Sequence, residues 1–219
     1  MSQESKGKVV VIQPTDTSLK TTDIVEKIIS GIMEDGEVNV VGINDAMFFA
    51  CAALNMATEI AKVYVDDIDI ATLEAPVLGK VVAISAHLSQ KSAGDYGKLA
   101  EQEDKALTDV GEQTISVSRA ATMERLLTIS LLRLARFDEL KIVAAGGSIN
   151  DAIVLALKLT NGQISKEPVG IKLFHLYSIV MRNDPTKSIA AASIYLQKGV
   201  TTRYTKRQSE VLKKLESGK

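Results

Sequence analysis

Apolar residues along this chain follow two periods, and the alternation between them predicts a regular order of strands and helices. Short β-branched runs such as KVVVI predict buried strands, whereas apolar positions three or four residues apart, as at Ile24, Ile28 and Ile32, predict helices. Two later segments alternate polar and apolar residues and predict an antiparallel hairpin. The expected order is strand, helix, strand, helix, strand, strand, over residues 8–12, 22–33, 38–41, 44–62, 63–70 and 80–87.

The same order begins again in the second half of the chain. Its expected elements are a strand at 114–117, a helix at 122–135, a strand at 140–144, a helix ending before Gly162, and a hairpin of 170–181 with 188–197. Residues 91–113 are rich in charge and glycine, which predicts a linker with a weak helix near 99–107. We therefore expect an α+β protein of two units, 8–90 and 114–197, followed by a basic tail or helix at 198–219.

A short internal repeat supports two copies of one unit. The tetrapeptide Ile-Asn-Asp-Ala occurs at 43–46 and at 149–152, and the same shift of 106 residues matches Ala50 with Ala156 and Asn55 with Asn161. Polar residues at this strand-to-helix junction predict helix caps. The expected cap and third helical residue are Ser148 and Asp151 in the second copy, and Gly42 and Asp45 in the first.

Composition narrows the functional classes. Hydrophobic residues make up 46% of the chain, enough for ordered cores, but only 4% are aromatic and none is Trp, which argues against binding single strands through stacked bases. The one cysteine, Cys51, lies in an apolar helix and is expected to be a buried thiol. No apolar run has the length of a membrane span and the N-terminus is polar, so a cytoplasmic protein is expected.

Charge is divided unequally along the chain. Residues 8–90 hold 5 basic and 12 acidic side chains, whereas residues 115–197 hold 10 and 6, and the tail at 198–219 holds 7 and 2. The formal net charge of −1 therefore hides an acidic first half and a basic second half. This division fits a phosphate-binding second half with a structural first half, or two solvated halves whose opposite charges help them to pair.

In the second half, the loop at residues 117–123 and the segment at residues 139–152 resemble the archaeal Alba family of small chromatin proteins. Residues 117–123, VSRAATM, fall on the family's I-G-K-K-P-x-M loop, and residues 139–152, ELKIVAAGGSINDA, fall without a gap on E-I-x-I-K-A-R-G-R-A-I-S-K-A. The first half is similar over residues 37–46, EVNVVGINDA, with a three-residue deletion at the R-G-R turn. The resemblance covers both repeats but neither the linker nor the tail.

The resemblance implies units of two helices on a four-stranded mixed sheet, paired as a pseudo-dimer within one chain, that bind double-stranded DNA or RNA with little sequence preference. Arg119 stands at the first lysine of the family's loop, and Ala120 stands at the second. Family members also use basic residues of the last hairpin. The nucleic-acid-binding residues expected on these grounds, with the basic tail, are Arg119, Arg182, Lys187, Lys20, Lys80, Arg203, Lys206 and Arg207.

The chain also departs from the family pattern at cationic positions. Ala145 and Gly147 replace two arginines, and Asp151, with Asp45 in the first repeat, replaces a lysine. Because nucleic-acid affinity rests largely on neutralising phosphates, these changes predict weaker and less salt-dependent binding.

Two functions from different classes therefore stay open. One is a nucleoid-associated protein that binds DNA or RNA. The other is a structural or adaptor protein that keeps the fold and works through a protein partner, with or without homo-oligomers. Asp66, Asp67 and Asp69 lack the spacing of a calcium loop, and His87 and His175 are isolated, so no metal, cofactor or catalytic residue is predicted.

Overall fold

The computed structural model describes residues 8–13, 20–61, 63–75, 79–90, 111–161, 167–181 and 184–202. These residues fall into two compact units, 8–90 and 111–202, which are taken one at a time below. The expected linker helix near 99–107, the helix stop at Gly162 and the tail from Arg203 onward lie outside the described residues.

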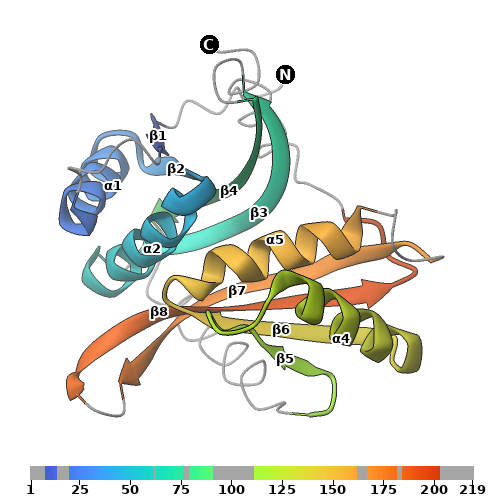
Figure 1. Ribbon diagram of the computed structural model, residues 1–219. Coiled ribbons are helices and arrows are strands. Elements are labelled where there is room, and N and C mark those ends of the chain that lie inside the picture. Colours follow the sequence, from blue (N-terminus) through green and yellow to red (C-terminus); the bar gives the residue numbers. More distant parts are fainter. Residues whose placement is uncertain are drawn as a thin grey trace. The chain divides into compact units, whose positions relative to one another are not determined.

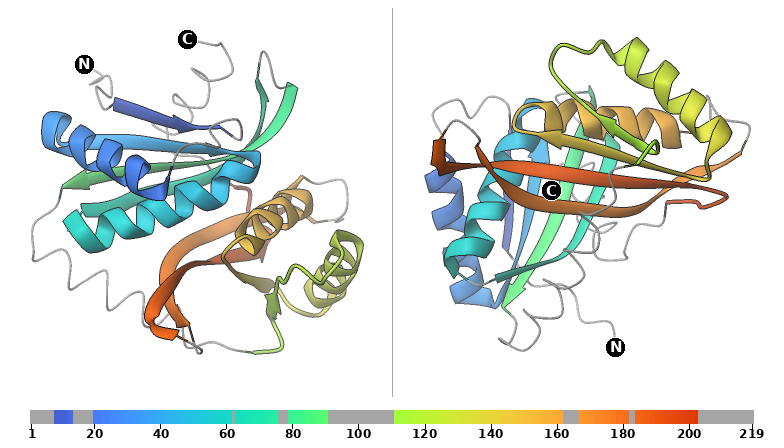
Figure 2. Two further views of the ribbon diagram at one scale, coloured as in Figure 1. Left: turned by 60° about the vertical axis from the view of Figure 1, so that its left-hand side comes forward. Right: turned by 90° about the horizontal axis from the view of Figure 1, so that it is seen from below.

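The first unit is a four-stranded mixed sheet with its helices on one face (Figures 1 and 2). The strand order is β1-β2-β4-β3, with β1 parallel to β2 and the other neighbours antiparallel. Its elements are β1 (Lys8–Ile12), α1 (Thr21–Asp35), β2 (Glu37–Ile43), the 3-10 turn η1 (Asn44–Ala46), α2 (Met47–Ala61), β3 (Val63–Ala75) and β4 (Gly79–Gln90).

The second unit repeats this arrangement, with the order β5-β6-β8-β7 and one parallel pair, β5 with β6. Helices α4 and α5 lie on one face of its sheet (Figure 1). Its elements are β5 (Thr114–Ser116), α4 (Met123–Arg136), β6 (Glu139–Ala145), α5 (Ser148–Thr160), β7 (Val169–Met181) and β8 (Asp184–Lys198). The predicted α+β class, the order of the elements and the antiparallel hairpins are confirmed.

Two glycines of the first unit lie so close to neighbouring elements that they show which face of the sheet carries the helices. A Cβ on Gly31 of α1 would lie 3.2 Å from Val38 Cγ2, and a Cβ on Gly42 would lie 2.6 Å from the Cβ of Ala50 in α2. Val38, Val40 and Gly42 share one face of β2 because alternate residues of a strand point the same way. Both helices therefore pack on that face, and the odd-numbered residues of β2 point to the opposite face.

The register of the repeat differs from the expected shift of 106 residues. Strands β2 and β6, of seven residues each, begin at Glu37 and Glu139, which are 102 residues apart. Residues 46, 47, 50, 51, 53, 54, 55 and 57 are buried, and so is every residue 102 positions later. A shift of 106 would instead pair buried Asn55 with exposed Asn161. The two Ile-Asn-Asp-Ala copies are therefore not equivalent: the first spans a strand end and a turn, and the second lies inside α5.

The helix caps expected at this junction are also wrong. Gly42 lies within β2, and the residue that precedes η1 is Ile43. In the second unit Gly147 is the cap residue of α5, and Ser148 is already the first helical residue. The sequence pattern Ser-x-x-Asp fits a capping box only when the serine precedes the first helical residue, and the glycine pair lets the helix begin one residue earlier.

Both hairpins are longer than predicted. Strand β3 continues to Ala75 and β8 begins at Asp184, where strands ending at Ile70 and beginning at Ser188 were expected. The register shifts between Val65 and Asp67 and again between Val180 and Met181, which interrupts the alternation from which strand ends are inferred. The second shift lies beside Pro185, a residue that cannot donate to a regular ladder.

Candidate nucleic-acid interface

The parallel pair β5 and β6 brings two loops of the second unit together. The carboxyl ends of parallel neighbours lie at the same edge of a sheet, so the segment after β5 and the turn after β6 meet there. The backbone N–H of Val117 donates to the carbonyl of Val143 at 2.8 Å, which extends the pairing toward that edge. Residues 118–122 then lead into α4, whose cap is the hydroxyl of Thr122, and Gly146-Gly147 lead into α5.

Arg119 lies directly over Gly147 at this edge. A Cβ on Gly147 would lie 2.3 Å from Nη2 of Arg119, 3.1 Å from Cζ and 3.2 Å from Nε, so the guanidinium occupies the space that a side chain would need. Arg119 is exposed, and it forms no ion pair within the part of the chain that the structure describes. Gly147 therefore makes room for the arginine of the other loop.

The turn under Arg119 also begins a helix of 13 residues. Gly146 has φ 57°, and its carbonyl accepts from the N–H of Ile149 at 3.0 Å. The first turn of a helix leaves backbone N–H groups without partners inside the helix and carries partial positive charge. With the guanidinium of Arg119 above it, this corner presents two kinds of donor that suit a phosphate oxygen.

The corresponding corner of the first unit has a different character. Asn44 and Asp45 stand where the second unit has Gly146 and Gly147, given the shift of 102 residues. Asn44 has φ 49°, and its Oδ1 accepts from the backbone N–H of Val82 at 3.0 Å, so the turn is fixed by its own side chain. Asp45 is exposed and puts a carboxylate where the second unit has a guanidinium. This corner of the first unit therefore repels phosphate.

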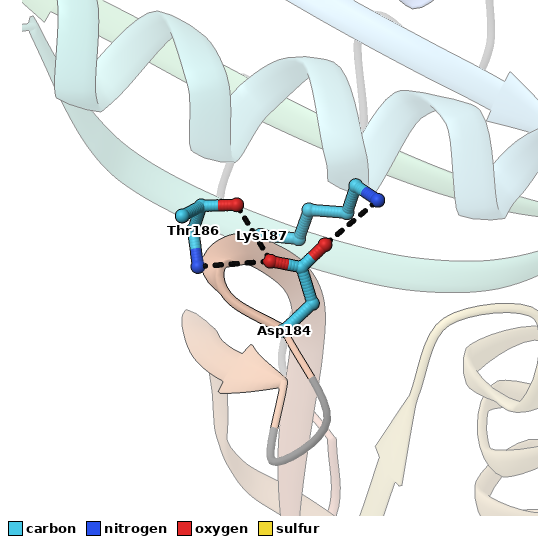
Figure 3. A network of polar contacts seen from close by, with 3 residues as sticks. All are labelled: Asp184, Thr186 and Lys187. Carbon is cyan, nitrogen blue, oxygen red and sulfur yellow. Dashed lines mark hydrogen bonds and ion pairs between the residues drawn. The ribbon is translucent and has the colours of Figure 1, made fainter.

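Lys187, at the end of the last hairpin, is held by a neighbouring carboxylate (Figure 3). Its Nζ lies 2.8 Å from Oδ2 of Asp184, and the hydroxyl and backbone N–H of Thr186 donate to Oδ1 at 2.6 and 3.2 Å. The hydrogen bond from Lys187 first, and then those from Thr186, lower the pKa of Asp184. Lys187 is exposed, but much of its charge is balanced by this carboxylate.

The other expected contacts are not gathered at the Arg119 corner. Lys20 is exposed beside the start of α1, where its backbone N–H donates to Asp23 Oδ2 at 3.1 Å. Lys80 is exposed on β4 opposite Glu74 of β3. Both belong to the first unit. Arg182, Arg203, Lys206 and Arg207 lie outside the described residues.

Several cations of the second unit were not singled out from the sequence. Arg125, in the first turn of α4, follows the Arg119 loop directly and is exposed, as are Arg136 and Lys158. The other cations with described positions are engaged. Nη1 of Arg133 donates to the carbonyl of Thr114, and Lys172 pairs with Glu139 at 2.7 Å. Lys198 pairs with Asp138 at 3.1 Å, and Lys141 is buried beside the ring of Tyr195. The helical spacing of the arginines in residues 123–136 is the signal that would have pointed to Arg125.

The residues weighed as metal or catalytic candidates have structural surroundings. His87 is buried with Nε2 3.2 Å from Oε2 of Glu37, and His175 stacks on Tyr177 with ring centroids 5.3 Å apart. Asp67 and Asp69 share a face of β3, as their alternation predicted. Cys51 is fully buried, and desolvation raises the pKa of its thiol to about 12. No group of three metal-binding side chains gathers within the described ranges.

A scan of protein-family models finds no match to this chain, and a comparison with curated proteins finds no similar sequence. Over the residues with described positions, no helix combines the length and apolar character needed to cross a membrane.

Proposed function

We propose that this protein binds double-stranded DNA or RNA without sequence preference, as a two-unit relative of the Alba chromatin proteins. The observation that carries the proposal is the position of the Arg119 guanidinium over Gly147 at the beginning of α5. An arginine fork and the N-terminus of a helix both favour phosphate oxygens, and neither reads base identity.

The two units have separate roles in this proposal. The basic second unit contacts phosphate through Arg119, with Arg182 and Lys187 of the hairpin and with Arg203, Lys206 and Arg207 of the tail. The acidic first unit, with Asp45 at its equivalent corner, is the partner of the second unit in a pseudo-dimer. Its Lys20 and Lys80 make secondary contacts with phosphate. A covalent linker raises the effective concentration of one unit for the other to about the millimolar range. The proposal includes no catalytic step and no cofactor, and it places the protein in the cytoplasm at the nucleoid.

A second candidate function is an adaptor that keeps the fold and binds a protein. Ion pairing favours it, because the lysines at 172, 187 and 198 are each matched with a carboxylate. Such a protein would show no salt-dependent affinity for either nucleic acid.

Fluorescence anisotropy with labelled duplex DNA and duplex RNA, measured at several salt concentrations, tests the site. We expect Arg119→Ala to weaken binding and to reduce the slope of log affinity against log salt by about one, since one phosphate contact is lost. Lys158→Ala is the matched control, because Lys158 is exposed near the opposite end of α5. If Arg119→Ala and Lys158→Ala behave alike, Arg119 is not a phosphate contact.

A further inference from the structure

The sheet of the first unit has a second face, which its own helices do not cover although most of its residues are buried. Because α1 and α2 pack on the side of Val38 and Val40, the opposite face presents the odd-numbered residues of β2 with their cross-strand neighbours. Those neighbours are Ser85 and His87 of β4 and, beyond them, Asp67 and Asp69 of β3.

One end of this second face is apolar. Six buried residues form a cluster there, with Val11 of β1 packed against it. Its members are Val41, Ile43, Ala71, Leu73, Val81 and Ala83. An apolar surface of this kind is stabilised when another segment removes it from water.

The other end of this second face is polar and acidic. Glu37, Asp67 and Asp69 lie there, and the face carries no lysine or arginine among the described residues. Asn39, opposite His87, is 1% exposed, and both polar atoms of its side chain lack a hydrogen-bond partner within the described structure. A buried amide without partners costs free energy. The partly exposed carboxylates of Glu37, Asp67 and Asp69 suit an occupant that brings positive charge.

One segment of this chain has the matching chemistry. Residues 203–219, RYTKRQSEVLKKLESGK, carry six basic and two acidic side chains. Tyr204, Val211, Leu212 and Leu215 recur at helical spacing, which predicts an apolar stripe bordered by lysines and arginines. As a helix, 17 residues would extend for about 25 Å, comparable to the length of a seven-residue strand such as β2.

We propose that residues 203–219 dock as an amphipathic helix on this second face of the first unit's sheet and account for its burial. The apolar stripe covers the cluster around Val41 and Leu73, and the basic residues lie against Glu37, Asp67 and Asp69. Docking holds Arg203, Lys206 and Arg207 against carboxylates of the same chain and so competes with phosphate for them. The docking itself does not depend on the proposed nucleic-acid binding, and its test uses no nucleic acid.

Limited proteolysis of the full chain tests the docking. Trypsin cleaves after lysine and arginine, so the tail offers several sites, whose cutting rates mass spectrometry can follow. We expect Asp67→Lys and Leu212→Asp each to speed tail cleavage by about tenfold, because proteolysis follows the population of the undocked segment. Glu26→Lys is the matched control, since Glu26 is exposed on α1, which packs on the helix-bearing face. Equal cleavage rates in the wild type, Asp67→Lys and Leu212→Asp would overturn the proposal.

A disulfide test identifies the occupant. Asp67→Cys is combined with a single cysteine at 206, 207, 213 or 214, while Cys51 stays unreactive because it is fully buried. Docking predicts at least one pair that forms a disulfide within one chain, seen as a monomer that migrates faster on a non-reducing gel. Disulfides that only join two chains would mean that a second copy occupies the face, and no disulfide at any position would mean that the tail does not; either result overturns the proposal.

Discussion

At the scale of single residues, the neighbouring glycines 146 and 147 have different reasons to be glycine. Gly146 has φ 57°, a conformation that side chains rarely adopt, and a Cβ there would lie 2.7 Å from Cδ1 of Ile189. Gly147 has an ordinary helical φ of −61°, and the three atoms nearest to its Cβ would all belong to the flexible end of Arg119. Gly146 therefore allows the left-handed backbone of the turn, and Gly147 leaves space for the guanidinium of Arg119.

This difference predicts opposite outcomes for two alanine substitutions. Gly147→Ala should leave the free energy of unfolding within about 1 kcal/mol of the wild type, because its backbone suits alanine, while nucleic-acid affinity falls because the guanidinium is displaced. Gly146→Ala should destabilise the fold by about 1 kcal/mol or more through its left-handed backbone. Urea unfolding and anisotropy measure the two effects. Unchanged affinity in Gly147→Ala would show that the position of Arg119 over the turn does not matter for binding.

The sequence predicted the residue types at this corner better than their roles. Arg119 was singled out from the loop pattern, and the strand before Gly146 was expected. Its contact with Gly147 could not be predicted, because the two residues are far apart in sequence and meet only through the parallel pairing of β5 with β6. The expected cap at Ser148 failed because a local pattern is compatible with two helix starts, and packing against the sheet decides between them.

At the scale of elements, the hairpin of β7 and β8 ends in a local network that opposes the proposed role of Lys187. Asp184, Thr186 and Lys187 bind one another within four residues (Figure 3). Hydrogen bonds lower the pKa of Asp184 from its ordinary value of 3.8, so the carboxylate stays charged over the neutral range. Its contribution to stability is present above that ordinary value and is lost as the pH falls through the lower value of the folded state.

The variant Asp184→Asn tests whether Lys187 contacts phosphate once its ion pair with Asp184 is removed. Removing the carboxylate should raise affinity for duplex nucleic acid and increase the salt slope, because Lys187 gains freedom to contact phosphate. Anisotropy at neutral pH measures the change, and Asp138→Asn is the control, since Asp138 neutralises Lys198 at the other end of the hairpin. An unchanged affinity would remove Lys187 from the interface.

Element order was predictable, whereas element limits and the alignment of the repeats were not. Periods of two and of three to four residues identified the strands and helices in both units. The shared tetrapeptide suggested a shift of 106 residues, one helical turn away from the shift of 102 that the buried positions support. A helix keeps a similar buried face after a shift of four residues, so sequence matching alone could not tell the two registers apart.

At the scale of the whole molecule, the formal charge of −1 combines an acidic first unit and an acidic linker with a basic second unit and a basic tail. A chain with a small net charge can still bind phosphate when its cations gather on one surface. The proposed relation to the Alba proteins implies modest affinity rather than the tight binding of a fully basic protein, because Ala145, Asp45 and Asp151 stand where the Alba pattern has cations.

The most direct test of the proposed function is duplex binding by the full chain over a range of salt concentrations. We predict that affinity for duplex DNA or duplex RNA exceeds affinity for single strands and falls as salt rises, with a slope that corresponds to a few phosphate contacts at roughly 0.9 per contact. If neither duplex binds at the lowest salt concentration, the nucleic-acid proposal is contradicted, and the adaptor function becomes the better account of this fold.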